Sequence, residues 1–247
     1  MTPSRLVPAA LLATLSLLAA GAAFALFNTK IVPSGKVATE SREARGFTGV
    51  AVSIPATVVL RQGEPASVSV EADDNLLPEV ETVVEGGTLK IRFKRSLDIP
   101  GRATLRVLVV SPTIESLSLA GSGDILAESL RSKSLSISVS GSGDVRIAKL
   151  EAESLKASIA GSGDVKVAGK VATLSASIAG SGDLEASRLE AARAKVSIAG
   201  SGDVALWASE SLDVSSVGSG DVRYLGNPVV KSSSVGSGSV TRLGPAP

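Results

Sequence analysis

The sequence predicts an all-β protein whose residues 111–247 form a single-stranded parallel β-helix, a solenoid of about seven rungs. Three observations predict this fold. The tripeptide Gly-Ser-Gly begins at positions 121, 141, 161, 180, 200, 218 and 236, so it recurs every 18–20 residues. Apolar residues occupy every second position before most copies, which is the period of a β-strand. Val, Ile, Ser and Gly dominate the repeats, and the apolar stripes of a helical repeat are missing.

The first 25 residues have the pattern of an export signal. A short basic start, Met1–Arg5, precedes the uncharged apolar run Leu6–Phe27, and Ala23-Phe24-Ala25 fits the small-residue cleavage pattern. Cleavage there gives a mature protein that begins at Leu26. The apolar run is longer than a usual signal sequence, so an uncleaved membrane anchor is the alternative. Both interpretations place the body of the protein outside the cytoplasm, in the periplasm or at the cell envelope or surface.

Residues 26–45 predict a linker, because they are polar and include Pro33-Ser34-Gly35. Residues 46–110 predict a β-rich cap together with the first rungs. Alternating apolar residues indicate strands within 47–54, 58–60, 68–71, 89–93 and 105–109.

Two turns are expected in this N-terminal part. Gly86-Gly87 predicts a tight hairpin, and residues 74–80 predict a single helical turn. We expect the apolar residues of that turn to close the open end of the solenoid, because a stack of rungs needs a cap. The segment 46–247 is therefore expected to be one continuous unit.

Each repeat predicts a strand before the Gly-Ser-Gly corner, a shorter strand after it, and one further apolar residue that closes the rung. In one rung these are Leu135–Ser140, Val145–Ile147 and Leu150. A single rung cannot close a core, but stacked rungs share one. Burying each large aliphatic side chain stabilises the fold by about 1.5–3 kcal/mol, which offsets much of the entropy lost when the chain is ordered. We expect the coil to be right-handed, although the spacing itself does not set its hand.

The tetrapeptide Gly-Ser-Gly-Asp predicts the corner between the two strands. Glycine accepts positive φ, serine is small, and aspartate accepts hydrogen bonds from nearby backbone amides, as in an Asx turn. These properties favour a structural role for the six aspartates, while the seventh copy ends in Ser239. The six are Asp124, Asp144, Asp164, Asp183, Asp203 and Asp221.

A ladder of these six carboxylates is also the candidate metal site. Stacked rungs would place them about 4.8 Å apart, where like charges repel unless they are paired or bind a cation. Calcium binds carboxylate oxygens, so a calcium ladder is the alternative interpretation. The period is twice that of the glycine-rich calcium nonapeptide, however. Arg146, Lys166 and Arg223 also lie two residues after an aspartate, on the same strand face, and can balance its charge.

Composition excludes several classes of function. The chain of 247 residues has no Cys and no His, which argues against thiol, imidazole, zinc, haem and iron–sulfur chemistry. Its formal net charge is +1, and no basic block is present, which argues against a nucleic-acid partner. We expect no cofactor, with calcium as the alternative.

The order of motifs resembles the bacterial family of putative autotransporter adhesin head domains, the head GIN domain family (DUF2807). The resemblance lies in the runs Phe47–Val52, Val58–Gly63, Val68–Ala72, Asn75–Leu77 and Gly87–Ile91, followed by the Gly-Ser-Gly-Asp rungs. It covers about residues 46–243. It implies a β-helix made in the bacterial envelope, and it supplies no catalytic residue, ligand or partner.

Three functions are compatible with the sequence. We favour a non-enzymatic exported module of structural or adhesin-like character, which binds an envelope or surface protein or glycan through the long faces of the solenoid. A calcium-stabilised binding module is one alternative, and a polysaccharide-active β-helix enzyme is the other. The enzyme is disfavoured because the aspartates repeat identically, whereas catalytic residues usually interrupt a repeat. The repeats contain two aromatic residues, Trp207 and Tyr224, at different offsets from their aspartates, so we expect both to serve packing.

Overall fold

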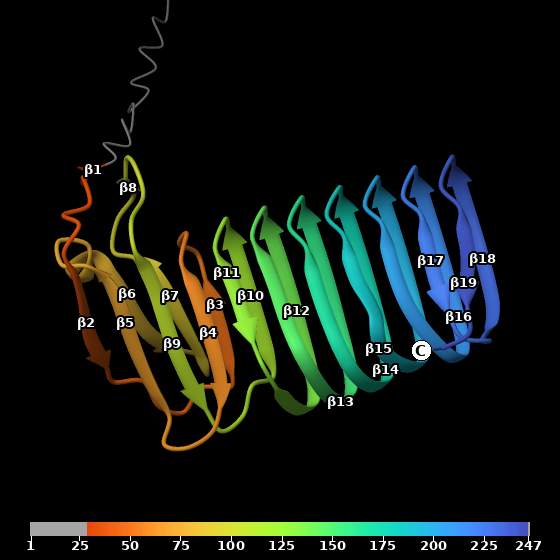
Figure 1. The fold of residues 1–247 in the computed structure, drawn as a ribbon, viewed down its shortest axis with the longest axis horizontal. Helices are drawn as coiled ribbons and strands as arrows, with labels where there is room; N and C mark the ends of the chain where they lie inside the picture. Colours follow the sequence, from red (N-terminus) through yellow and green to blue (C-terminus); the bar gives the residue numbers. More distant parts are fainter. Residues whose placement is uncertain (1–28, 247) are drawn as a thin grey trace, which may run out of the picture.

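The computed structural model describes residues 29–246, and it is an elongated β-solenoid of about six turns, close to the expected seven rungs. Its rungs stack side by side along the longest axis, from the N-terminal part at one end to the C-terminus at the other (Figure 1). One 17-stranded sheet coils through the whole body. The predicted signal peptide at residues 1–25 lies outside the described residues. Among the residues described, no helix is long and apolar enough to cross a bilayer.

The rungs consist of parallel strands that wrap around the coil. As the rungs become regular, the strands on the two sides of a rung merge, so that a single strand continues from one corner to the next. The strands are β10 (Ser116–Gly121), β11 (Asp124–Ala127), β12 (Leu130–Gly141), β13 (Asp144–Gly161), β14 (Val165–Gly180), β15 (Leu184–Gly200), β16 (Val204–Gly218), β17 (Val222–Leu225), β18 (Val229–Gly236) and β19 (Val240–Gly244).

Equivalent positions of successive rungs pair in parallel register, which produces columns of like residues. One inward column contains Val139, Ile159, Ile178 and Ile198, and all four side chains are buried. The outward positions between them are occupied by serine and alanine. Every second residue of each strand therefore points into a shared core, which confirms the solenoid that the repeat predicts.

The N-terminal part continues the rungs without a break. Strands β3 (Gly49–Val52) and β4 (Thr57–Gln62) pair in parallel with β10 and β11, and β7 (Thr88–Phe93) and β9 (Leu105–Ser111) pair in parallel with β3 and β4. The first Gly-Ser-Gly rung thus stacks on a preceding coil that lacks the tetrapeptide.

Antiparallel strands close this end of the stack. β5 (Ser67–Asp73) pairs antiparallel with β9, and β6 (Val80–Glu85) forms a hairpin with β7 across Gly86 and Gly87, both of positive φ. A single 3₁₀ turn, η1 (Leu77–Glu79), follows β5, and Leu76 and Leu77 are buried in the core. The hairpin and the helical turn agree with the sequence predictions.

The segment expected to be a linker differs from that expectation. Within its described residues lie β1 (Thr29–Lys30), which pairs with β8 (Leu97–Asp98), and β2 (Val37–Arg42), which pairs antiparallel with β5. The physical reason is the free edge of β5, whose unpaired amides and carbonyls need partners. Polar composition concealed β2, because an edge strand exposes most of its side chains.

The corner glycines are required by close stacking. Gly161 has a φ of 125°, and a Cβ built there would lie 2.4 Å from the carbonyl oxygen of Gly141. A Cβ on Gly163 would lie 2.2 Å from the carbonyl oxygen of Gly143. Any side chain at these two positions would separate adjacent rungs.

The core becomes polar toward the C-terminal end. Ser216 and Ser234 continue the isoleucine column, and the hydroxyl of Ser216 is buried without a hydrogen-bond partner. In the same two rungs, Val217 and Val235 point outward and are exposed. These two rungs therefore carry serine in the inward column and valine on the outer face, the reverse of the preceding rungs.

Candidate functional site

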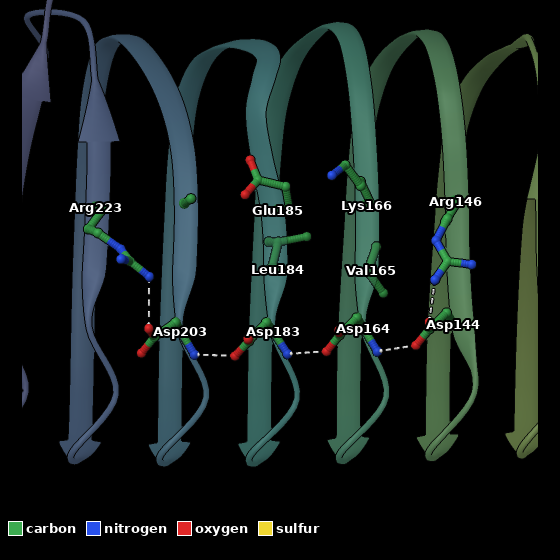
Figure 2. Close-up of a pocket in the computed structure, with 11 residues that line it drawn as sticks. Asp144, Arg146, Asp164, Val165, Lys166, Asp183, Leu184, Glu185, Asp203 and Arg223 are labelled. Carbon is green, nitrogen blue, oxygen red and sulfur yellow. Dashed lines mark hydrogen bonds and ion pairs between the residues drawn. The ribbon is translucent and has the colours of Figure 1, made fainter.

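The six predicted aspartates lie at the start of the second strand of successive rungs, where each corner ends. Figure 2 shows Asp144, Asp164, Asp183 and Asp203 in one row, with each linked to the next. These four aspartates line a shallow hollow of about 320 Å³ on the outer face of the sheet. The structure thus brings the predicted residues together in a line and leaves them open to solvent.

Each carboxylate in the row accepts a hydrogen bond from the backbone amide of the next rung. The amide of Asp164 donates to Oδ1 of Asp144 at 3.0 Å, and the amide of Asp183 donates to Oδ1 of Asp164 at 3.0 Å. The pattern continues through Asp203 and Asp221 at 2.8 and 2.9 Å. We name this row, Asp144 to Asp221 with Ser239, the aspartate ladder. Its bonds join one rung to the next, where an Asx turn bonds within its own turn.

The two ends of the ladder differ from its middle. Asp124 stands outside it, because the amide of Asp144 donates instead to the carbonyl oxygen of Gly123 at 3.2 Å. At the other end, both the amide and the hydroxyl of Ser239 donate to Oδ1 of Asp221, at 2.8 and 2.9 Å. These two bonds, the amide first, hold the pKa of Asp221 below its ordinary value, and the nearby Arg223 adds a smaller effect. Five aspartates therefore form the ladder, and Ser239 ends it.

Two of the three predicted cations pair with the ladder. Arg146 lies 2.6 Å from Oδ2 of Asp144 in its own rung, and Arg223 lies 2.9 Å from Oδ2 of Asp203 in the preceding rung. Lys166 makes no ion pair within the described part of the chain. Charge balance in the ladder thus comes from backbone amides at every step and from arginine at two of them.

Within the described residues, the acids of the ladder are not grouped as the ligands of a metal centre are. In residues 29–246, no three Asp, Glu, His or Cys side chains are grouped so that they can hold a metal ion. Glu185, the other acid in the hollow, accepts hydrogen bonds from the amide and hydroxyl of Ser187. An oxygen of each ladder carboxylate is already engaged with an amide, so the arrangement is suited to holding backbone in place.

The two aromatic residues of the repeats lie apart from this hollow. Tyr224 is half-buried and packs against the core, and Trp207 is half-buried on β16, paired in register with Leu225. Neither lines the row of aspartates.

Sequence reasoning missed a second hollow on the same outer face. It lies where the N-terminal part meets the first rungs, has a volume of about 510 Å³, and is called the junction groove below. Its lining residues are Val59, Arg106, Leu126, Ala127, Glu128, Arg146, Ile147, Ala148, Lys166, Ala168 and Arg188. Leu126 was the available signal, because it is a leucine at the offset where the following rungs have Arg146 and Lys166.

Solved structures with the same fold come from bacteria. A putative adhesin from Bacteroides fragilis is 26% identical, with a TM-score of 0.82 over 86% of this chain and 100% of the other. A putative lipid binding protein from Parabacteroides distasonis is also 26% identical, with a TM-score of 0.72 over 87% of this chain and 100% of the other. A putative adhesin from Parabacteroides merdae, at 20% identity, has a TM-score of 0.69 over 87% and 99% of the two chains and supports the fold alone.

Sequence comparison agrees with the structural one. No curated protein matches the chain significantly. A family model does match, over residues 46–228, which include the N-terminal coil, the cap and all five aspartates of the ladder. The chain therefore belongs to the family described as putative auto-transporter adhesin, head GIN domain.

Proposed function

We propose that this protein is an exported, non-enzymatic, adhesin-like module of the cell envelope, and that its solenoid faces bind a surface protein or glycan. The observation that favours this function most is the use of the repeated carboxylates. The aspartates are the most strongly repeated ionisable side chains in the chain, and their Oδ1 atoms accept hydrogen bonds from backbone amides. The family and the adhesin named at 26% identity agree with a binding role.

Export is part of the proposal and is tested separately. The expected signal peptide predicts a mature protein that starts at Leu26 and is found in the periplasm or envelope fraction. Mass spectrometry of the N-terminus, on protein recovered from fractionated cells, measures both points. An intact Met1 in the cytoplasmic fraction would contradict export.

The binding role is tested by crosslinking the mature protein in intact cells and identifying the captured partner. We expect an envelope or surface component, captured reproducibly and in competition with added purified protein. Capture of no envelope component under conditions that crosslink a control envelope complex would contradict the proposal.

The enzyme alternative makes a different prediction. If the row of aspartates acted on uronate polymers, the purified protein would shorten such polymers and Asp164→Ala would abolish that activity. We expect no cleavage by either protein, because the row offers identical carboxylates without a separate acid and base. Cleavage by the wild type that is lost in the variant would overturn the proposed function.

A further inference from the structure

The junction groove departs from the repeat in one row of the outer face. Val59 of β4, Leu126 of β11 and Arg146 of β13 are neighbours in register, and Lys166 of β14 follows. Leu108 of β9 continues the row on the other side of Val59. The row therefore changes from three aliphatic side chains to two cations within five adjacent strands.

The aliphatic side chains form the floor of the groove. Val59 and Leu126 point outward from the sheet, yet both are half-buried, and Ala148 and Ala168 extend the apolar lining. Leu108, the next residue of the row, lies outside this lining, in a neighbouring hollow. None of these side chains can donate or accept a hydrogen bond. The floor therefore favours a ligand with an apolar portion.

Cations without partners surround this floor. Arg106, Lys166 and Arg188 are exposed and make no side-chain hydrogen bond or ion pair with any residue in 29–246. Arg146 is already paired with Asp144, and the one carboxylate in the lining is Glu128. Glu71 and Glu185 are the register neighbours of Arg106 and Lys166, but neither acid lines the groove or forms an ion pair with these cations. The protein as a whole has a net charge of only +1, so the excess of positive charge is confined to the lining. It favours an anionic group on the ligand.

We propose that the junction groove binds a single anionic lipid, with an acyl chain on the apolar floor and the acidic head group among Arg106, Lys166 and Arg188. The inference rests on the proposed binding function and names a ligand class for one face of the module. A glycan fits less well, because the lining contains no aromatic side chain on which a sugar ring can stack. Docking on a bilayer also fits less well, since the apolar side chains are half-buried below an exposed cationic rim.

The test measures binding of palmitate to the purified, delipidated protein by displacement of a dansyl-labelled fatty acid. Two variants address the two halves of the groove: Leu126→Gln removes apolar floor, and Arg106→Glu combined with Lys166→Glu reverses rim charge. The matched control is Lys156→Glu, an exposed lysine on another row of the same solenoid. Circular dichroism and thermal unfolding establish that each variant is folded.

We expect saturable palmitate binding that both groove variants weaken by about tenfold or more, equivalent to about 1.4 kcal/mol, and that the control leaves unchanged. Absence of saturable binding, equal weakening by Lys156→Glu, or displacement of the probe by polygalacturonate as readily as by palmitate would overturn the inference. Binding to phosphatidylglycerol vesicles without binding of dispersed palmitate would also overturn it, because it would indicate bilayer docking.

Crosslinking in cells separates this inference from the proposed function. If the rim variant loses lipid and still captures its envelope partner, both proposals stand and use different surfaces. If palmitate never binds while an envelope partner is captured, the lipid inference alone is wrong. If neither lipid nor partner is bound, the proposed function is wrong as well.

Discussion

A single aspartate in the ladder links two rungs through one carboxylate oxygen. Oδ1 of Asp164 accepts a hydrogen bond from the backbone amide of Asp183. Without this bond the amide would have no hydrogen-bond partner in the protein at the corner. An asparagine keeps a carbonyl oxygen at that place, whereas an alanine leaves the amide to water. The charge of the carboxylate and its geometry can therefore be separated by mutation.

We expect Asp164→Ala to lower the free energy of unfolding by about 1.5 kcal/mol, because one hydrogen bond to a charged group is lost. Asp164→Asn should lose less, since it retains the acceptor. Urea denaturation of the three proteins measures the difference. Equal losses in the two variants would mean that charge, and not the acceptor oxygen, is what the position needs.

The corner glycine is the second residue-scale requirement. A Cβ on Gly163 would meet the Gly143 carbonyl oxygen at 2.2 Å, so Gly163→Ala must push two rungs apart. We expect a loss of about 1–3 kcal/mol in unfolding free energy, or failure to fold. Ser162→Ala, in the same tetrapeptide, is the control and should change stability by less than about 0.5 kcal/mol. A tolerated Gly163→Ala would contradict the close stacking.

Titration of Asp221 predicts a dependence of stability on pH. Because the folded protein holds the pKa of Asp221 below its ordinary value, its carboxylate stabilises the fold above about pH 4, and the effect is lost as pH falls through the folded pKa. Asp221→Asn cannot titrate. We expect the stability advantage of the wild type over this variant to shrink between about pH 6 and about pH 3. Asp213→Asn, an exposed aspartate outside the ladder, is the control; a pH-independent difference for Asp221→Asn would contradict the shift.

At the scale of the element, each rung is stabilised mainly by its two neighbours, so a defect in one column is local. Ser216 is such a defect. It follows Ile198 in a column of buried isoleucines, and its hydroxyl has no hydrogen-bond partner. The rung that contains Ser216 is therefore less stable than it would be with an apolar residue at this position.

We expect Ser216→Val to raise the free energy of unfolding by about 1–2 kcal/mol, because it removes an unsatisfied hydroxyl and buries apolar surface. Ser215→Val, on the exposed neighbouring position, is the matched control and should have little effect. Thermal unfolding monitored by circular dichroism measures both. A destabilised Ser216→Val would show that the column cannot accept a larger side chain at this rung.

At the scale of the whole molecule, the repeated positions were predictable and the unrepeated ones were not. Gly-Ser-Gly positions, strand alternation and the Gly86-Gly87 hairpin are local signals, and the structure agrees with all three. Strand β2 and the exclusion of Asp124 from the ladder depend on which backbone groups remain free beside them. These relations follow from packing in three dimensions, which a repeat alone does not encode.

The junction groove was unpredictable for the same reason. Val59, Arg106 and Leu126 come from strands far apart in sequence and meet in one groove when β9, β4 and β11 pair. The sequence contains no motif that links them. A regular solenoid thus reveals its architecture in its repeats, while its candidate binding surface lies where the repeats begin.

The aspartate ladder joins successive rungs through backbone amides, and we expect it to need no metal. Thermal unfolding of the purified protein in calcium chloride and in EDTA, at equal ionic strength, measures whether a metal contributes to stability. We expect the same unfolding midpoint in both, because Oδ1 atoms of the ladder are engaged with amides. A midpoint that rises with calcium in the wild type, and no longer does so in Asp164→Asn, would show that the ladder binds calcium.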